Sequence, residues 1–344
     1  MEKARRPEGQ AETMNITADS LARKNSPGAG AGFKPAFVAG MTDNAGKVQG
    51  EGAGFSDLYV QGGVLRVGAL DRYPELLHGI SMRVAPDGED WNLSARRGSP
   101  EHPADPGVAL RNREKLAALL GISLDRVVGC RQVHGTLVAR VGAADAGKGM
   151  CPENPSIEGA DAMVTNVPGL YLMALSADCP SVFFYDPERG VVGLAHSGWK
   201  GTVGRIAGNV VAMMVDDFGC DPRHIVAVVG PGIGPCCYGV GENVVSAAEE
   251  AFMHAWGGPA PLLERRDGLV YFNLRESIRR AVVEAGVPAE NVTVEEVCTA
   301  HNLDLFYSHR AEKGQCGLFG AVVGLADDGR WTMDDGRWTM DDGR

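Results

Sequence analysis

Two histidines and one cysteine stand directly after short apolar stretches that are typical of buried strands. They are His134 in CRQVHG, Cys179 in SADCPS and His196 in LAHSGWKG. Side chains at the ends of neighbouring strands can meet at one point, and two imidazoles with one thiolate leave the fourth zinc position open, as in catalytic zinc sites. Their spacings of 45 and 17 residues match no compact zinc motif. The residues alone therefore allow two interpretations, a catalytic metal site or ordinary core residues.

The same three side chains are compatible with other chemistry. Two histidines and one cysteine also form the core of a mononuclear copper site. None of the eight histidines stands in a His-x-His pair, so this chain does not supply the paired imidazoles of a trinuclear copper centre. Without a metal, Cys179 could act as a nucleophile with His134 or His196 as its base, as in a cysteine hydrolase. A non-catalytic partner protein is the remaining alternative.

A glycine-rich turn follows His196 and leads into a predicted helix. Its sequence SGWKGT is close to a phosphate-binding P-loop, but Trp199 stands where the lysine of that motif belongs. A turn of this kind, a lysine and a helix N-terminus can together bind an anion such as phosphate. The alternative is a turn needed only for tight packing, with Lys200 in solvent.

A second glycine-rich stretch, VVGPGIGPCCYGVGEN, carries the adjacent thiols Cys236 and Cys237. Adjacent cysteines indicate a second metal or redox site or, more commonly, one buried and one partly exposed thiol. Further along, CTAHNLDLFYSHR places Cys298, His301 and Arg310 close together in sequence. The arginine is suited to a phosphate or a carboxylate, and a surface salt bridge is its alternative role.

Between residues 58 and 325, short β-branched stretches alternate with glycine-rich turns and amphipathic segments. The expected strands are 64–70, 126–134, 136–141, 161–166, 170–177, 181–186, 190–196, 225–231, 269–274, 291–297 and 320–325. The expected helices are 107–121, which ends on Gly121, 202–217, which begins at Thr202, 242–256 and 274–286. Many strands with helices between them predict an α/β or α+β fold, a single globular domain with a mixed β-sheet and flanking helices.

The composition restricts the class of partner. The 344 residues contain 33 Lys and Arg against 44 Asp and Glu, a net charge of −11, and they show no sustained basic stripe. This argues against a nucleic acid or an anionic membrane surface and favours a small molecule. The longest apolar stretches, such as 169–177, are shorter than the roughly 18 residues that a membrane helix needs. No membrane partner is therefore expected.

The two ends differ from the central part. Residues 1–55 are polar and rich in glycine, alanine and proline, lack the apolar core of a secretion signal, and are expected to form a disordered extension. Residues 326–344 repeat DDGRWTM, which predicts a low-complexity tail without chemistry of its own. Eight cysteines dispersed over a long chain favour free thiols or metal ligands over disulfides. Together these features predict a cytoplasmic protein.

Five motifs occur in an order and spacing that resemble the laccase-domain or polyphenol oxidase family. They are QVHG at 132–135, ADC at 177–179, AHSGWKGT at 195–202, GPGIGPCCYGVGE at 230–242 and CT…FYSHR at 298–310. The upstream stretches HGIS, WNLS and NR are similar to the N-terminal signature of that family. The resemblance covers about residues 72–325. The bacterial members of this family are regarded as purine nucleoside phosphorylases.

The resemblance implies a zinc ion held by His134, Cys179 and His196, which are then the catalytic site. It implies phosphorolysis of adenosine, inosine and S-methyl-5′-thioadenosine to base and ribose 1-phosphate, with deamination of adenosine as a second activity. A zinc-activated water suits attack on the purine C6. Phosphorolysis needs an anion site, for which the candidates are Lys200, Gly201, Thr202 and Arg310. The family's older name reflects phenol oxidation with copper, so Cu²⁺ is the alternative metal.

Two departures from the usual family pattern stand near Arg310. Family members commonly carry a second arginine directly after the first, and a Thr-Gly-Arg stretch further on. Here Ala311 and the stretch Gln315-Cys316-Gly317-Leu318 occupy these places. If either of those arginines contacts substrate, phosphate affinity or specificity differs in this chain. The expected partners are a purine nucleoside and phosphate, and the expected assembly is a monomer or a homodimer.

Overall fold

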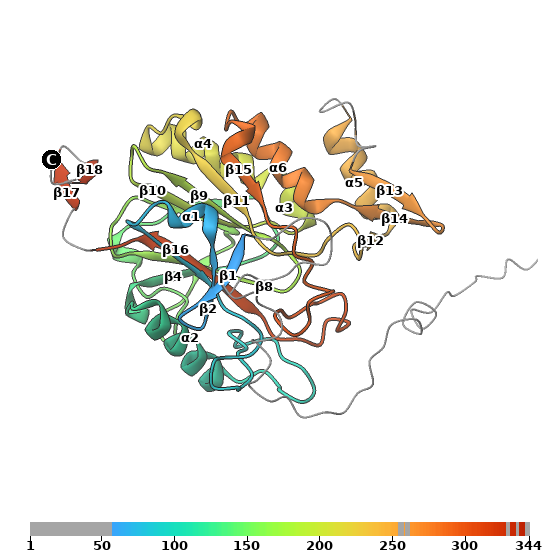
Figure 1. The fold of residues 1–344 in the computed structure, drawn as a ribbon, viewed down its shortest axis with the longest axis horizontal. Helices are drawn as coiled ribbons and strands as arrows, with labels where there is room; N and C mark the ends of the chain where they lie inside the picture. The colour runs from blue at the N-terminus through green and yellow to red at the C-terminus, as the bar shows by residue number, and fades with distance from the viewer. Residues whose placement is uncertain (1–56, 254–257, 259–261, 328–330, 335–336, 341–344) are drawn as a thin grey trace, which may run out of the picture. The chain divides into compact units, whose positions relative to one another are not determined.

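Two large β-sheets form the centre of the described structure, a computed structural model (Figure 1). It describes residues 57–253, 258, 262–327, 331–334 and 337–340, which belong to the unit Pro35–Arg344. The extension predicted at 1–55 lies outside these residues, as do the last three residues of the helix predicted at 242–256.

Both large sheets are mixed, because each contains parallel as well as antiparallel pairs of neighbouring strands. In spatial order, the first sheet consists of β1 (Leu58–Gln61), β2 (Val64–Val67), β3 (Leu76–Ile80), β16 (Phe319–Leu325), β8 (Tyr171–Ser176), β4 (Val127–Arg131) and β6 (Ile157–Glu158). The second consists of β15 (Val292–Val294), β11 (Val226–Val229), β9 (Ser181–Asp186), β10 (Val191–His196), β7 (Ala162–Thr165) and β5 (Val138–Arg140).

Two smaller sheets complete the described strands. The three-stranded sheet contains β12 (Gly239–Val240), β14 (Leu269–Phe272) and β13 (Leu263–Arg266). The last pair, β17 (Trp331–Asp334) with β18 (Arg337–Met340), lies in the DDGRWTM tail and is antiparallel. Two copies of one repeat thus pair with each other, with Trp331 opposite Met340.

The described helices are α1 (Gly68–Asp71), α2 (Pro106–Leu120), α3 (Trp199–Val203), α4 (Ile206–Phe218), α5 (Glu242–Phe252) and α6 (Leu274–Glu284). The longer helices α2, α4 and α6 lie on the outer faces of the two large sheets (Figure 1). α4 and α6 pack on the second sheet, whereas α2 packs on the first. In the part of the chain that the structure describes, no helix has the length and apolar composition that crossing a bilayer demands.

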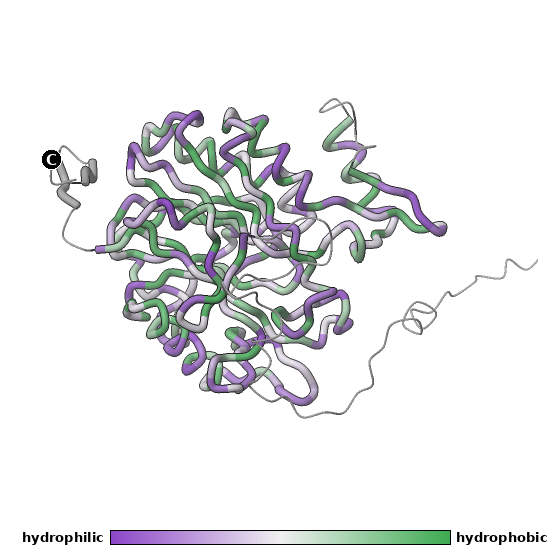
Figure 2. Tube along the Cα trace, viewed as in Figure 1, coloured by the Kyte–Doolittle hydropathy of each residue, from purple (hydrophilic) through white to green (hydrophobic). Residues whose placement is uncertain are grey.

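Alternate residues of β9 face the two sides of the second sheet. Phe183 and Tyr185 pack between the sheets, while Val182 and Phe184 pack under the helices. Because both sides are covered, all six residues of β9 are buried, and its sequence is a nearly continuous apolar stretch. Figure 2 shows the same concentration of hydrophobic residues along the central strands.

The predicted fold class is confirmed, although the strands divide between two large sheets instead of one. Each predicted strand overlaps an observed strand, and β9 and β10 form an antiparallel hairpin. The single helix predicted over 202–217 is wrong. The chain forms α3 and α4, separated at Gly204 and Arg205, where Arg205 has a positive φ of 65°. Thr202 lies inside α3, and its hydroxyl donates to the Gly198 carbonyl instead of beginning a helix.

Gly193 in β10 sets how closely α4 approaches the second sheet. A Cβ at this position would lie 2.9 Å from Cγ1 of Val210 and 3.3 Å from Cβ of Phe184. We predict that Gly193→Ala lowers the free energy of unfolding by about 1–3 kcal/mol, because overpacking forces the helix or the sheet to shift. Urea unfolding followed by circular dichroism measures this change.

Gly208→Ala in α4 is the matched control. A Cβ there meets its nearest neighbours at 3.8 and 3.9 Å, which is ordinary contact. Since alanine favours a helix over glycine, this variant should gain about 0.5–1 kcal/mol. Equal stability of the two variants would contradict the packing argument.

Candidate metal centre

Two of the loops that cross between the large sheets carry two of the three predicted ligands. The loop from β4 to β5 carries His134, and the loop from β8 to β9 carries Cys179. His196 is the last residue of β10 and comes from the second sheet. The ligand atoms of these residues, two imidazole nitrogens and one sulfur, all lie within 4.8 Å of one another. The structure therefore brings the three residues together as one site.

A single buried carboxylate, that of Asp161, holds both histidines in place. Its Oδ1 accepts the backbone N–H of His134 at 2.9 Å, and its Oδ2 accepts those of Val133 at 2.9 Å and Gly135 at 2.7 Å. Oδ1 also accepts Nδ1–H of His196 at 2.9 Å. Since a carboxylate can only accept, Nδ1 of His196 carries a proton, and Nε2 is the ring nitrogen that can bind a metal.

The backbone at the site is strained at two residues. His134 has a φ of 60° and Asp178, directly before Cys179, has a φ of 84°. This left-handed region is uncommon for residues other than glycine, and such residues concentrate at functional sites. The three N–H groups bound by Asp161 hold the His134 loop in that conformation.

The charges of the site favour a thiolate. Burial raises the pKa of the Cys179 thiol, but the neighbouring His196 and His134 outweigh it and lower that pKa to about 6. Burial lowers the pKa of His196, but the Cys179 thiolate and the Asp161 carboxylate raise it to about 9. Burial also raises the pKa of Asp161, whereas the hydrogen bonds from His196 and the backbone lower it below its usual value. At neutral pH the sulfur is therefore largely in the form that binds metals.

Gly198 leaves the space in which the ligands meet. A Cβ at Gly198 would lie 2.9 Å from Cδ2 of His134 and 3.0 Å from Sγ of Cys179. Such contacts are shorter than side chains tolerate, so any other residue displaces one ligand or the other. The glycine of the SGWKGT turn thus serves the close approach of the ligands.

The donor set fits a zinc ion. One thiolate and two imidazole nitrogens are preferred zinc ligands, and three protein ligands leave a coordination position for water or substrate. The bond between Asp161 and His196 is the carboxylate–histidine pairing that commonly orients a zinc ligand. Copper accepts the same donors, so the ligands suit either metal.

The three ligands line a surface hollow of about 700 Å³, a volume typical of small-molecule sites. Four arginines share this lining, namely Arg96, Arg97, Arg113 and Arg131. Arg113 donates to three backbone carbonyls, and Arg131 pairs with Glu158 at 3.3 Å. The guanidinium groups of the other two form no hydrogen bond or ion pair with the residues described. They are therefore the arginines of the hollow that can meet an anion.

Residues 90–326 match the family model described as multi-copper polyphenol oxidoreductase laccase. The chain belongs to this laccase family. The family resemblance predicted from the sequence motifs is thereby confirmed.

Two relatives carry names of purine enzymes. A protein of Geobacillus stearothermophilus named purine nucleoside phosphorylase YlmD is 36% identical over 65% of this chain and 80% of its own length. A protein of an unknown prokaryotic organism named adenosine deaminase RL5 is 34% identical over 58% of this chain and 74% of its own length. The solved structure of Bacillus licheniformis hypothetical protein YfiH has a TM-score of 0.71 and 28% identity, and the match covers 79% of this chain and all of that one.

In this laccase-family chain, the four predicted phosphate residues lie on two elements, and none of them is among the residues that line the hollow. Lys200 is exposed on α3, with Nζ 5.6 Å from the centre of the Trp199 ring. Gly201 and Thr202 are buried in the same helix. Arg310 lies in the segment before β16, where Nη1 donates to the carbonyl of Gly239 at 2.6 Å.

A hydrogen-bond network links Arg310 to the metal ligands. Its backbone N–H donates to Oδ2 of Asp178 at 2.7 Å, and the hydroxyl of Thr299 donates to Oδ1 at 2.6 Å. Asp178 directly precedes Cys179. The segments that carry Thr299 and Arg310 are therefore tied to the loop that delivers the thiolate.

Sequence reasoning missed the two aspartates of the site. Asp161 directly precedes β7, and Asp178 is the middle residue of the ADC motif. A signal was present in both cases, because each is a lone acidic residue at the end of an otherwise apolar strand. Such a residue must find buried donors, and here these are the backbone and side chains around the ligands.

The role of Asp161 predicts the effect of its amide variant. Asp161→Asn replaces one acceptor oxygen by a donor that faces backbone N–H groups and weakens the orientation of His196. We predict that zinc affinity falls roughly 10- to 100-fold. Competition with a chromophoric chelator measures the affinity.

Asp186→Asn provides the matched control for that variant. Asp186 is equally buried, at the end of β9, and its Oδ1 accepts the backbone N–H groups of Glu188 and Arg189. Its replacement can change stability but should leave zinc affinity unaltered. Unchanged zinc affinity in Asp161→Asn would show that the carboxylate does not support the site.

Proposed function

We propose that this chain is a zinc-dependent purine nucleoside phosphorylase. Its proposed substrates are adenosine, inosine and S-methyl-5′-thioadenosine with phosphate, and deamination of adenosine is a second proposed activity. One observation carries the proposal: the His134, Cys179 and His196 site opens onto a hollow that also contains Arg96 and Arg97. The names of the two relatives support both activities.

Phosphorolysis requires a bound anion beside a bound nucleoside. A phosphate oxygen bonds to C1′ of the ribose, the bond from C1′ to the purine nitrogen breaks, and the purine leaves with a proton. The products are the free base and ribose 1-phosphate. Arg96 and Arg97, whose guanidinium groups have no partner among the described residues, line the same hollow as the three candidate metal ligands, which supports an anion site there.

We assign the phosphate to Arg97, which lines the hollow, together with His309 and Arg310, which lie outside its lining in the segment before β16. Burial lowers the pKa of His309, and the charges of Arg97, Arg310 and His134 lower it further. A largely neutral imidazole there can donate a hydrogen bond to phosphate or accept one from it. The alternative phosphate position, predicted from sequence, is formed by Lys200, Gly201 and Thr202. It is the weaker candidate because the Thr202 hydroxyl is already bonded to Ser197 and Gly198.

The metal and its supporting residues have separate tasks in this proposal. When bound, zinc supplies a Lewis acid and lowers the pKa of a water for attack on the purine C6. Deamination of adenosine would consume one water and release ammonia, leaving inosine. Asp161 fixes the tautomer of His196, and Gly198 keeps the space between His134 and Cys179 open. The walls of the hollow would exclude water and orient the substrate.

The proposed setting is the cytoplasm, with a purine nucleoside and phosphate as partners. All eight cysteines are free in the structure, which suits a reducing compartment. The alternative activities are a copper-dependent phenol oxidase and a metal-free hydrolase with Cys179 as nucleophile. A zinc-loaded, copper-free preparation separates these, because it lacks the metal of the oxidase and the free thiolate of the hydrolase.

The decisive assay is release of adenine from adenosine by zinc-loaded protein, with and without phosphate. We predict release only with phosphate. In Cys179→Ala, adenine release should fall by more than about 100-fold and one zinc per chain should be lost, because the substitution removes a residue proposed to bind the metal directly. Chromatography of the bases and mass spectrometry of the metal provide the measurements.

Cys220→Ala is the control for that assay, since Cys220 is a buried thiol outside the hollow. It should keep both activity and zinc. Adenine release without phosphate, or full activity of the zinc-free Cys179→Ala protein, would refute the phosphorylase. Phenol oxidation by the copper-loaded form without any purine turnover would favour the oxidase.

The assignment of the phosphate gives a separate prediction. Arg97→Gln or Arg310→Gln should raise the KM for phosphate roughly 10- to 100-fold, since a charge-assisted hydrogen bond contributes about 1.5–3 kcal/mol. The KM for nucleoside should change less. Steady-state kinetics with phosphate varied at saturating adenosine gives both constants.

Arg140→Gln removes the same charge from β5, outside the hollow, and should leave the phosphate KM unchanged. Lys200→Gln tests the alternative position. A large effect in Lys200→Gln alone would move the phosphate to α3 and overturn the assignment to the arginines.

A further inference from the structure

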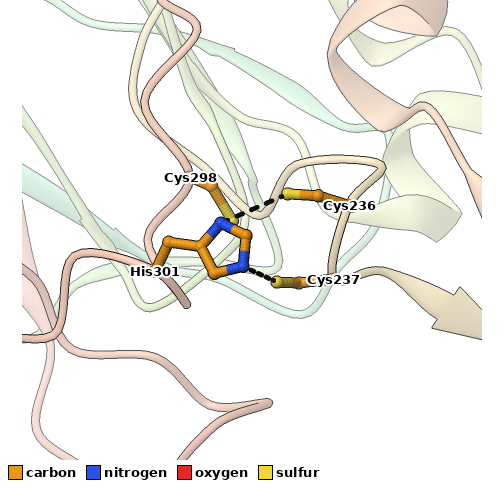
Figure 3. Close-up of side chains that lie close together, drawn as sticks. All are labelled: Cys236, Cys237, Cys298 and His301. Atoms are coloured by element: carbon orange, nitrogen blue, oxygen red, sulfur yellow. Dashed lines mark hydrogen bonds between the residues drawn. The ribbon is translucent and has the colours of Figure 1, made fainter. Parts of the chain in front are cut away.

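A second group of metal-binding side chains lies outside the hollow. Cys236 and Cys237 come from the loop after β11, and Cys298 and His301 come from the segment after β15 (Figure 3). One ligand atom of each residue lies within 4.8 Å of the other three. Cys237 and His301 are 64 residues apart in the chain. We propose that these four residues bind a second zinc ion, and we call them the Cys3His cluster.

The donor set specifies the kind of ion and site. Thiolate-rich groups select soft or borderline metals such as zinc and exclude magnesium or calcium. Three thiolates and one imidazole complete a tetrahedral zinc shell, which leaves no position for substrate. The Cys3His cluster is therefore a closed structural site, unlike the three-ligand site at the hollow. The proposal stands independently of the proposed enzymatic activity.

His301 lies in contact with two of the three sulfurs of the cluster. The two ring nitrogens of His301 face two different sulfurs, at 3.1 Å from Sγ of Cys237 and 3.6 Å from Sγ of Cys236 (Figure 3). None of the three cysteines is in a disulfide. Three thiols thus converge on one imidazole from two separate segments.

The surroundings support the charge of bound thiolates. The backbone N–H of Gly234 donates to Sγ of Cys298 at 3.2 Å, the kind of hydrogen bond that supports a metal thiolate. Arg275 is buried, and a Cβ at Gly234 would lie 3.0 Å both from its Nη2 and from Sγ of Cys236. Three thiolates with Zn²⁺ carry one net negative charge, which the guanidinium offsets. A glycine is required at position 234 because a side chain would enter this contact.

An ion can reach the site from solvent. A hollow of about 580 Å³ is lined by Cys236, Cys298 and His301, and both Cys236 and His301 are exposed. Cys298 is buried at the base of the cluster. This arrangement gives the metal an access path while it holds two loop segments together.

The second ion would support the loop that carries Cys179. Thr299, next to Cys298, donates its hydroxyl to Asp178, the residue before Cys179. On the other segment, Tyr238 directly follows Cys237, and its ring lies 5.1 Å from the guanidinium of Arg310. A zinc ion at the Cys3His cluster therefore fixes two supports of the first site without contacting the substrate.

The test is a count of zinc ions per chain in the full-length protein. After gel filtration, elemental and native mass spectrometry should find two zinc ions in the wild type and one in Cys179→Ala. Cys236→Ser and His301→Ala should also hold one, and the double variant Cys179→Ala, Cys236→Ser should hold none. Cys236 and His301 are both exposed, so these variants are expected to fold.

Cobalt distinguishes the two sites by spectroscopy. Cys179→Ala protein loaded with Co²⁺ should show the near-ultraviolet sulfur-to-cobalt absorption of three thiolates. In the double variant Cys179→Ala, Cys236→Ser this absorption should be about a third lower, because one thiolate is lost. His102→Ala, a change at another exposed histidine, should leave the metal count unaltered. A chelator should lower the melting temperature of Cys179→Ala but not of the double variant.

Three results would overturn the second site. One is a folded Cys179→Ala protein that holds no zinc. Another is a disulfide within Cys236, Cys237 and Cys298 in freshly purified protein. The third is an unchanged zinc count in both Cys236→Ser and His301→Ala. Loss of phosphorolysis with two zinc ions bound would instead count against the proposed function alone.

Discussion

The carboxylate of Asp161 is the interaction on which the site depends. It is buried where water cannot solvate it, and it accepts four hydrogen bonds from the His134 loop and from His196. Those bonds lower its pKa and compensate for its burial. Removal of this one acceptor would leave a strained loop without its anchor and an imidazole without a fixed tautomer. The protein itself therefore holds the three candidate ligands in place.

The two-sheet architecture explains why the ligands can be so distant in sequence. The loops that follow β4 and β8 cross from the first sheet to the second. They place His134 and Cys179 close to His196 at the end of β10. The sheets are held by apolar side chains between them, such as Phe183, and by helices packed outside. Rigid strands thus position ligands that local sequence could not bring together.

The individual strands and the three site residues could be predicted from the sequence. The features that could not be predicted depend on contacts between segments distant in the chain or on backbone conformation. Strands buried on both faces have continuous apolar sequences, so the sequence predicts them. A histidine or cysteine at the end of such a strand is visible in the same pattern. The division of strands between two sheets depends on long-range pairing. The role of Asp161 depends on hydrogen-bond partners on other segments, which the local sequence does not reveal. The proximity of Cys237 to His301 likewise has no local signal, and the break at Arg205 needs a backbone conformation that helical periodicity does not reveal.

His134 and Cys179 lie on crossings between the sheets, while His196 ends a strand of the second sheet. An ion bound by all three therefore acts as a cross-link across the sandwich, and its binding free energy adds to the cohesion of the two layers. If the ion is bound, the lifetime of the folded chain against cellular proteases would rise and fall with the supply of metal. Metal starvation would then lower the abundance of the protein, and its breakdown would release the ion.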